Sequence, residues 1–500
     1  MLVLDARLAA LDILSADGRL EGLEEREQEI PVSERGENPI EIILLKEWYV
    51  KQVGIQDRLE QLTDQISFIP ERNKQLLLDW MENISIDWPI SRRRWYHTEI
   101  PIWYTDDHKV LIVPPKGAYV RPWCEDPPKG SFGIDRETRE ILGPIEELGY
   151  TKFTGEEKVF DTWMDSSNSN LYVSGYGQKD VDFARTYPTN LRPQGKEIVR
   201  TWLYYTLLKS AHLFDQPGFK SVWIDGLGMD PWGRKMSKSW GNGIDADSVL
   251  NCGVSGRTGS WKIRGPDGKS VNLRANKIGS ECFRLWKAAD AQVGDDFHIN
   301  PEEIESKYFG ILTKIYNVAR FASQFPFEDL RPSVIKPEDV WILSEYDNLI
   351  KETMEDWKRI DIYSATQKVK VFLTGIFSSH WMELAKTRLY DSDSSSLWTI
   401  HSILSGCLKI FSPVCPLFCH HLSTILYNES TIKVDMYPTP LGYDLQDRTK
   451  ITQSIVKFNT MVWKEKKSQN VSLKSSVSGI EIPEPLQDYS EGLTKMHNLV

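Results

Sequence analysis

The sequence predicts a fold in two parts, an α/β region followed by an all-α region. In the first part, a short apolar strand over 222–224 runs directly into glycines at Gly226 and Gly228. Before it, a Pro- and Gly-bearing stretch that includes Gly195 leads into a mostly apolar helix, and this alternation is typical of parallel α/β sheets. From about residue 301 onward, helical spacing of apolar residues dominates the chain.

Size and composition limit the classes of protein to which the chain can belong. The 500 residues allow about two to four domains with ample core. Without a run of about 18 apolar residues or a basic-then-apolar N-terminus, we expect neither a membrane protein nor a secreted one. The six cysteines include no Cys-x-x-Cys pair, which favours reduced thiols and a cytoplasmic location. The net charge of −11 argues against indiscriminate coating of nucleic acid, but it leaves open an RNA that is held by local basic patches and by its shape.

The loop after the 222–224 strand carries the strongest chemical signal. Lys235 and Lys238 stand three residues apart, with hydroxyls at Ser237 and Ser239 beside them. Mobile ammonium groups can follow the charge that develops on a polyphosphate leaving group, and flanking glycines let such a loop open and close. An isolated Lys/Ser turn in solvent is the plainer alternative. The position directly after a strand and turn favours phosphate chemistry.

Two stretches before this loop carry weaker signals. Residues 160–170 follow a strand signal with a cluster of Asp, Ser and Asn that is typical of a turn. At the start of the next helix, Gly195 would admit a ligand close to backbone N–H groups, and Glu197 could accept from ribose hydroxyls. A plain buried helix explains the same residues.

Three further patterns each leave two interpretations. Taken alone, the arginines at 92–94 suit contact with phosphates or a solvated face. The resemblance of residues 90–104 to the signature of a known family implies either function or a tightly specified core. The hairpin at 261–273 carries Lys262, Arg264 and Lys269, with Arg274 just beyond, so it is either simply solvated or in contact with a tRNA acceptor arm. The Cys and His residues at 415–421 lie on an apolar helix, which favours core packing over a metal site.

The spacing of apolar residues predicts further secondary structure along the chain. We expect helices over 2–20, 51–85 and 278–297, and an irregular surface insert over 105–158. In the second part, we expect helices over 308–321, 341–357, 363–389, 397–427 and 449–467.

Several of these stretches together resemble the class I aminoacyl-tRNA synthetases, and among them the archaeal-type valyl-tRNA synthetases. The matching strings are KMSKS at 235–239, ISRRR at 90–94, EIPIWY at 99–104, DTWMDSS at 161–167, KIYNVARF at 314–321 and SPVCPLFCHHL at 412–422. The resemblance covers essentially the whole chain. It implies the C-terminal half of a class I Rossmann catalytic domain, followed by a helical-bundle anticodon-binding domain.

The resemblance also implies roles for individual residues. Lys235 and Lys238, supported by Ser237 and Ser239, would stabilise pyrophosphate during attack of the amino acid on the α-phosphate of ATP, which is used with Mg²⁺. The nucleotide would be bound by Gly195 and Glu197 at the ribose and by Gly226, Leu227 and Met236 at the adenine. A small apolar pocket for the valine side chain would be lined by Trp163, Ile198 and Trp202. The acyl group would then pass to tRNA(Val).

The chain departs from the family's pattern in three respects. It has no His-x-Gly-His motif, and its first residues already resemble the closing segment of the editing insert, so we expect the C-terminal part of a synthetase. Glu197 replaces the aspartate of the family's ribose motif. At one place where relatives carry a zinc-binding knuckle, this chain has Ser33, Glu34 and Arg35. At a second such place it has Thr105 instead of a cysteine, so we expect no zinc.

The expected domains are the end of the editing insert and its return segment (1–50), the catalytic half-domain with inserts (51–300), the anticodon-binding domain (301–445) and a C-terminal extension (446–500). The leading hypothesis is a valine–tRNA ligase whose chain needs an N-terminal half for activity. That half is absent from a truncated sequence or supplied as a second subunit of a split enzyme. A non-catalytic tRNA-binding paralogue is the rival hypothesis, and an isoleucyl or leucyl enzyme is a weaker one.

Overall fold

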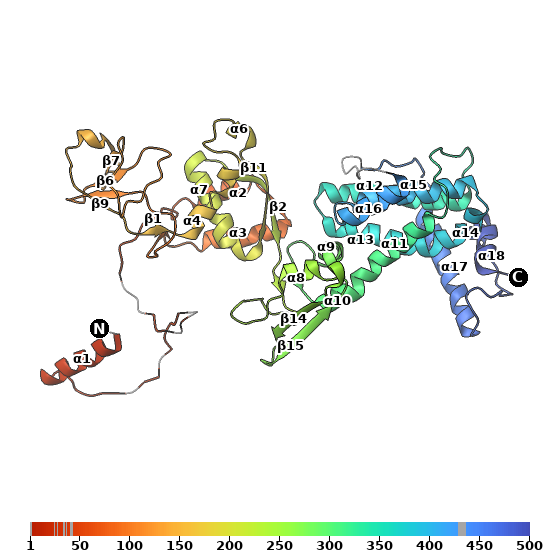
Figure 1. Cartoon of the computed structure of the whole chain (residues 1–500), viewed down its shortest axis with the longest axis horizontal. Helices are drawn as coiled ribbons and strands as arrows, with labels where there is room; N and C mark the ends of the chain where they lie inside the picture. The colour runs from red at the N-terminus through yellow and green to blue at the C-terminus, as the bar shows by residue number, and fades with distance from the viewer. Residues whose placement is uncertain are drawn as a thin grey trace. The chain divides into compact units, whose positions relative to one another are not determined.

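The computed structural model describes residues 3–24, 26–27, 29–33, 36, 38–40, 44–428 and 437–500 (Figure 1). Glu34 and Arg35, part of the expected zinc-free stretch, lie outside the described residues. The chain forms two compact units: unit 1 comprises residues 1–51 and 88–160, and unit 2 comprises residues 52–87 and 161–500.

Unit 1 contains an antiparallel sheet of five strands in the order β8-β7-β6-β5-β9. These strands are β5 (Trp103–Thr105), β6 (Val110–Val113), β7 (Phe132–Asp135), β8 (Ile141–Pro144) and β9 (Phe153–Gly155). Trp103, Val110, Ile112 and Val120 form its core. The expectation of an irregular insert over 105–158 is therefore wrong: the strands are short and separated by Pro- and Gly-rich turns, which hide their alternation in the sequence.

The rest of unit 1 is small. It contains α1 (Val3–Ala16), the short helix η2 (Ile145–Glu147) and two antiparallel strand pairs. One pair joins β1 (Tyr49–Val50) to β3 (Trp88–Pro89), and the other joins β4 (Ser91–Arg92) to β10 (Val159–Phe160).

Unit 2 begins with a three-stranded parallel sheet in the order β11-β12-β2. The strands are β2 (Ser67–Ile69), β11 (Thr189–Gly195) and β12 (Phe219–Asp225), so the strand expected over 222–224 is confirmed. Around them lie α2 (Gln56–Thr63), η1 (Glu71–Asn73), α3 (Lys74–Glu82), α4 (Thr162–Ser166), α5 (Ser169–Val173), α6 (Phe183–Thr186), η3 (Lys196–Ile198), the π-helix η4 (Val199–Leu203) and α7 (Tyr204–Phe214). The helix expected over 51–85 is interrupted by β2, whose apolar residues are too few to show the two-residue period of a strand.

Beyond the sheet, short elements link it to the helices that follow. They are β13 (Gly228–Met229), α8 (Ala246–Asn251), η5 (Val254–Gly256), the hairpin of β14 (Gly259–Arg264) and β15 (Ser270–Ala275), α9 (Gly279–Asp290) and β16 (Phe297–His298). The hairpin pairs Ile263 with Val271, in the register that the turn sequence predicts.

The remainder of unit 2 is helical, which confirms the predicted α/β-then-all-α fold. Its elements are α10 (Pro301–Ile304), η6 (Glu305–Phe309), α11 (Gly310–Ala322), α12 (Pro337–Lys358), α13 (Ile362–Val371), η7 (Phe372–Trp381), α14 (Met382–Tyr390), α15 (Ser394–Phe411), α16 (Pro416–Tyr427), α17 (Arg448–Ser468), η8 (Glu484–Tyr489) and α18 (Ser490–His497). The predicted 397–427 helix is two helices, because Pro416 starts a new helix at its first position.

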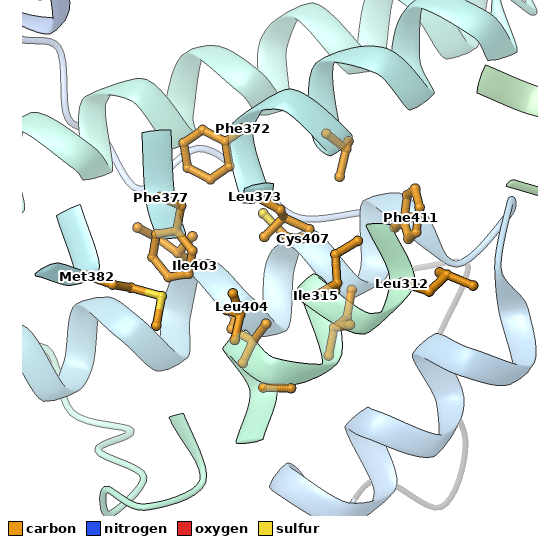
Figure 2. Close-up of a cluster of buried hydrophobic side chains, with 14 of the residues drawn as sticks. Leu312, Ile315, Phe372, Leu373, Phe377, Met382, Ile403, Leu404, Cys407 and Phe411 are labelled. Atoms are coloured by element: carbon orange, nitrogen blue, oxygen red, sulfur yellow. The ribbon is translucent and has the colours of Figure 1, made fainter. Parts of the chain in front are cut away.

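Apolar side chains from several of these helices meet in one core. Figure 2 shows Ile315, Phe372, Phe377, Leu404 and Cys407 converging from α11, η7 and α15. Cys415 and Cys419 are also buried in this cluster, so they pack in the core as expected, while His420 is half-buried and His421 is exposed.

Candidate active site

The carboxyl ends of the parallel strands bring two of the predicted segments to one edge of the sheet. Gly195 at the end of β11 is the register partner of Asp225 at the end of β12. The residues that follow each strand, Lys196 to Ile198 and Gly226 to Leu227, therefore leave the sheet at the same edge. This edge is the usual place for ligands in open α/β sheets.

At this edge, Glu197 folds back over Gly195. A Cβ atom at position 195 would lie only 2.4 Å from Oε2 of Glu197, so the glycine leaves room for the carboxylate. Glu197 is exposed, and its carboxylate is thus accessible as a hydrogen-bond acceptor. The two residues of the proposed ribose motif lie together, while their role toward a nucleotide stays a prediction.

The lysine loop that follows β13 is built on a buried polar frame. Asp230, which is 0% exposed, accepts from Nε of Arg234 at 2.8 Å and from Nδ2 of Asn242 at 2.9 Å. Asn242 is also buried and accepts from the backbone N–H of Ser237 at 2.8 Å. Burial alone would raise the pKa of Asp230, but its hydrogen bonds with Arg234 and Asn242 outweigh it and lower that pKa. The frame therefore holds a carboxylate beneath the loop.

On this frame, the two lysines are exposed to solvent. Within the described part of the chain, neither the Lys235 nor the Lys238 ammonium group has a hydrogen bond or an ion pair. The hydroxyls of Ser237 and Ser239 lie 2.8 Å apart and hydrogen-bond to each other. Two uncompensated positive charges and two hydroxyls thus lie on one short loop, which is a composition suited to an anionic ligand.

The residues predicted to face adenine are in close contact with other residues of the protein. A Cβ atom at Gly226 would lie 1.6 Å from the backbone oxygen of Asp295, so the close approach of that segment already requires glycine. The N–H of Leu227 donates to Asp296 at 2.7 Å. The Met236 methyl group lies close to Gly228. Their proposed contact with a nucleotide stays a prediction.

The residues predicted to bind the amino acid side chain lie on neighbouring elements. Trp163 and Ile198 are half-buried, on α4 and at the end of η3. Trp202 lies in the π-helix η4, and its indole N–H donates to the Ser166 carbonyl of α4 at 2.8 Å. This hydrogen bond brings η4 beside α4, and π-helical turns occur often at functional sites. The joint pocket itself stays a prediction.

Sequence reasoning missed Arg192, which is buried on β11. Its guanidinium carbon lies 3.6 Å from the centre of the Trp202 ring, and within the described residues the only hydrogen bond of its side chain is a long one, 3.4 Å, to the Trp202 carbonyl. Burial lowers the pKa of Arg192 to about 9, so it is still charged at neutral pH. The signal in the sequence is that Arg192 and Gln194 lie two residues apart on a strand. Their side chains therefore point to the same face of the sheet, and both are buried.

The arginine-rich stretch at 92–94 belongs to unit 1. Arg92 donates to the carbonyls of Pro89 and Ser91, and Arg93 forms an ion pair with Glu47. The next two side chains are almost fully exposed, Trp95 at 97% and Tyr96 at 91%. These two aromatic residues therefore do not belong to a tightly specified core.

The described residues contain neither a cluster suited to a metal ion nor a helix suited to a membrane. In the ranges that the structure describes, no three His, Cys, Asp or Glu side chains are grouped so as to hold a metal ion. Thr105, where a cysteine was expected in metal-binding relatives, is buried and donates to Asp107 at 2.7 Å. None of the helices that the structure describes is long and apolar enough to cross a membrane.

Solved structures share the fold of this chain. Methionyl-tRNA synthetase of Mycobacterium tuberculosis, in complex with methionyl-adenylate, matches 79% of this chain and 65% of its own with a TM-score of 0.53 at 16% identity. A leucyl synthetase of Agrobacterium radiobacter, in a ternary complex with tRNA, matches 71% of this chain and 42% of its own with a TM-score of 0.50 at 16% identity.

Curated relatives match over nearly the full chain. The valine–tRNA ligase of Nanoarchaeum equitans is 33% identical over 99% of this chain and 60% of its own length, and that of Aeropyrum pernix is 31% identical over 99% and 57%. The chain thus spans about 60% of the length of these relatives.

Family models match both parts of the chain. The model described as the anticodon-binding domain of tRNA ligase matches residues 339–481. The model described as tRNA synthetases class I (I, L, M and V) matches residues 14–300, which is more than half of the chain. The chain therefore belongs to the class I tRNA synthetases that this model describes.

Proposed function

We propose that this protein takes part in valine–tRNA ligation, that is, the ATP-dependent activation of valine and its transfer to tRNA(Val). The observation that carries the proposal is the pair of exposed, uncompensated lysines, Lys235 and Lys238, held on the buried Asp230–Asn242 frame. The choice of valine is supported by the relatives, which are valine–tRNA ligases of Nanoarchaeum equitans and Aeropyrum pernix.

In the proposed reaction, a carboxylate oxygen of valine attacks the α-phosphorus of ATP, and the bond to the bridging oxygen of pyrophosphate breaks. The negative charge that develops on the leaving pyrophosphate is stabilised by the ammonium groups of Lys235 and Lys238, with Mg²⁺ as the accompanying cation. Gly195 and Glu197 bind the ribose. The valyl group then passes from the adenylate to the terminal adenosine of tRNA(Val), and AMP leaves.

The valine side chain would lie against Trp163, Ile198 and Trp202. An apolar pocket of this kind excludes larger side chains by size, but it separates valine from threonine, of nearly equal shape, only about a hundredfold. The pocket residues therefore set size selectivity rather than full accuracy.

We also propose that further polypeptide completes the centre, either within the same protein or as a separate N-terminal half. This is supported by β11, which among the described strands pairs only with β12 and leaves its other edge available. It is also supported by the relatives, about 40% of whose length lies outside the match. We assign the reaction to the cytoplasm, where free thiols such as the six of this chain stay reduced.

The test is valine-dependent exchange of pyrophosphate into ATP. The chain is assayed alone and mixed with the part of the Nanoarchaeum equitans enzyme that lies outside the match. We expect exchange in whichever sample is complete, and at least a thousandfold loss when Lys235→Ala and Lys238→Ala are combined, because both charges that stabilise pyrophosphate are removed. tRNA binding should persist in that variant.

The matched control replaces two exposed lysines of the same unit, Lys179→Ala with Lys220→Ala, and should leave exchange unchanged. Normal exchange in the Lys235/Lys238 variant would refute the assigned roles. Absence of exchange from every sample, with tRNA still bound, would instead support the non-catalytic tRNA-binding alternative.

A further inference from the structure

The β14–β15 hairpin has two chemically different faces. One is apolar and packs into the core of unit 2 through Trp261, Ile263, Leu273 and Ala275. The other face is exposed, and β14 and β15 alternate so that every residue on it is polar. In register, it presents the pairs Ser260–Arg274, Lys262–Asn272 and Arg264–Ser270.

This exposed face carries three positive charges and no carboxylate. Among the described residues, the side chains of Lys262, Arg264 and Arg274 form no ion pair. Two acids beside the hairpin have other partners: Asp267 in the turn lies 3.8 Å from Lys269, and Glu302 accepts from the backbone N–H of Arg274, not from its side chain, at 3.0 Å. The three charges are therefore not neutralised locally, although the chain as a whole carries a net charge of −11.

The neutral residues of this face narrow the class of ligand. Ser260 and Asn272 hydrogen-bond to each other at 2.8 Å and stand between the cations, together with Ser270. Lysine, arginine, serine and asparagine are among the side chains that contact phosphate oxygens of nucleic acids. The face has no aromatic side chain on which a base could stack. It is thus suited to the backbone of RNA and not to reading its sequence.

The hairpin is also joined to the lysine loop and its frame by two hydrogen bonds to the backbone of Arg264. The N–H of Arg264 donates to the carbonyl of Gly241 at 2.9 Å, and the carbonyl of Arg264 accepts from Arg234 at 2.6 Å. Arg234 in turn forms an ion pair with the buried carboxylate of Asp230 at 2.7 Å. The same arginine thus connects the end of β14 to the frame that holds the lysine loop.

We propose that the exposed face of the β14–β15 hairpin binds the phosphate backbone of RNA, and that bound RNA steadies the lysine loop through Arg264 and Arg234. The identity of that RNA as tRNA rests on the proposed function. The contact is electrostatic and independent of base sequence. In this proposal the side chain of Arg264 contacts phosphate, while its backbone holds the lysine loop. Substitution of the side chain therefore removes the phosphate contact and keeps the hydrogen bonds of the Arg264 backbone that connect the hairpin to the loop.

The first experiment measures the affinity of the full protein for a tRNA(Val) transcript over a range of salt concentrations. The test variant combines Lys262→Ser, Arg264→Ser and Arg274→Ser. Each phosphate contact contributes about 0.7 to 0.9 to the slope of log affinity against log salt concentration. Loss of three contacts should therefore reduce the slope by about 2 to 3.

The matched control removes three exposed cations of unit 2 outside the hairpin, through Lys179→Ser, Arg185→Ser and Lys220→Ser. It changes net charge by the same amount and should keep the parent slope. Equal slopes in the parent and the hairpin variant, or an equal loss in the control, would overturn the proposal. Displacement of the RNA from the hairpin by poly-glutamate at equal charge concentration would overturn RNA in favour of an acidic protein partner.

The effect of bound RNA on the lysine loop is measured by hydrogen–deuterium exchange of residues 237–241. The backbone N–H of Ser237 donates to Asn242, and that of Gly241 donates to the carbonyl of Ser237. RNA should slow exchange of these amides in the parent and not in the hairpin variant. Protection confined to 259–275 would overturn the link.

Valine-dependent pyrophosphate exchange needs no RNA, so the hairpin variant should retain the exchange activity of its parent. If the parent shows no exchange either alone or mixed with the part of the Nanoarchaeum equitans enzyme that lies outside the match, the proposed function fails, while the salt-dependence result still decides the RNA surface.

Discussion

Two buried aspartates in unit 2, Asp230 and Asp339, have the same chemistry and different settings. Each is 0% exposed and bound by an arginine. Arg234 binds Asp230 through Nε at 2.8 Å, and Arg388 binds Asp339 through two nitrogens at 2.7 and 2.8 Å. The first pair lies beneath a loop that exposes free lysines, whereas the second is enclosed by helices.

The surroundings of Asp339 leave no acceptor capacity for a ligand. Trp381 donates to it at 3.0 Å and Ser395 at 2.6 Å, in addition to Arg388. Asp393 compensates the same arginine at 2.9 Å. A buried ion pair is therefore not a mark of function by itself. The distinguishing feature of the Asp230 site is the uncompensated charge that it supports at the surface.

The largest expected effect comes from breaking the enclosed pair. Arg388→Met leaves the side chain of Asp339 buried without its principal partner, which should lower the free energy of unfolding by about 3–5 kcal/mol. Chemical denaturation of the full protein measures the loss. Arg359→Met is the control, because Arg359 is largely exposed although it also pairs with a buried aspartate, Asp356. An equal loss in both variants would contradict the importance of enclosure.

A second buried polar group in the helical region should make stability depend on pH. Burial, followed by the charges of Lys466 and His380, lowers the pKa of His497 to about 4. An unfolded histidine has a pKa of about 6.5, so the unfolded chain binds more protons between these values. The contribution of His497 to the free energy of unfolding should therefore be constant above about pH 7 and fall by about 3 kcal/mol as pH drops from 6.5 to 4.

The measurement is denaturation over this pH range for the parent and His497→Gln. In the parent, His497 shares a hydrogen bond with Asn459 at 2.8 Å, and the amide of glutamine can also hydrogen-bond but does not titrate. The variant should lose this part of the pH dependence. An unchanged profile would show that other groups are responsible.

The next effect tests whether a glycine near the lysine loop is required by the fold. Gly226→Ala brings a Cβ atom to 1.6 Å from the backbone oxygen of Asp295, so we expect a loss of about 1–3 kcal/mol in unfolding free energy. At Gly228 the nearest atom would be 3.1 Å away, at the end of the Ile299 side chain, which makes Gly228→Ala the milder control. Undiminished stability with weakened ATP binding in Gly226→Ala would instead support the nucleotide role.

Parts of the chain also differ in how far their structure could be predicted from the sequence alone. The strand before the lysine loop, the hairpin register and the helical second part were predictable, because their periods and turn residues are local signals. The five-stranded sheet of unit 1 was not, since its strands are only three or four residues long. Buried polar contacts were also missed: the bonds of Asp230 span up to 12 residues, and that between Arg388 and Asp339 spans 49.

The smallest effect should come from the frame beneath the lysines. Asn242→Ala removes the donor to Asp230 and to the Lys235 carbonyl, together with the acceptor for the N–H of Ser237. Arg234 still neutralises Asp230, so stability should change little while the lysines are held less firmly. We expect about a tenfold slower valine-dependent exchange, equivalent to about 1.4 kcal/mol. Asn251→Ala is the control: the amide of Asn251 donates to Asp247, and its removal should leave the rate unchanged. Exchange at the parent rate in Asn242→Ala would mean that the lysines act without the frame, and the contrast with Asp339 would lose its functional meaning.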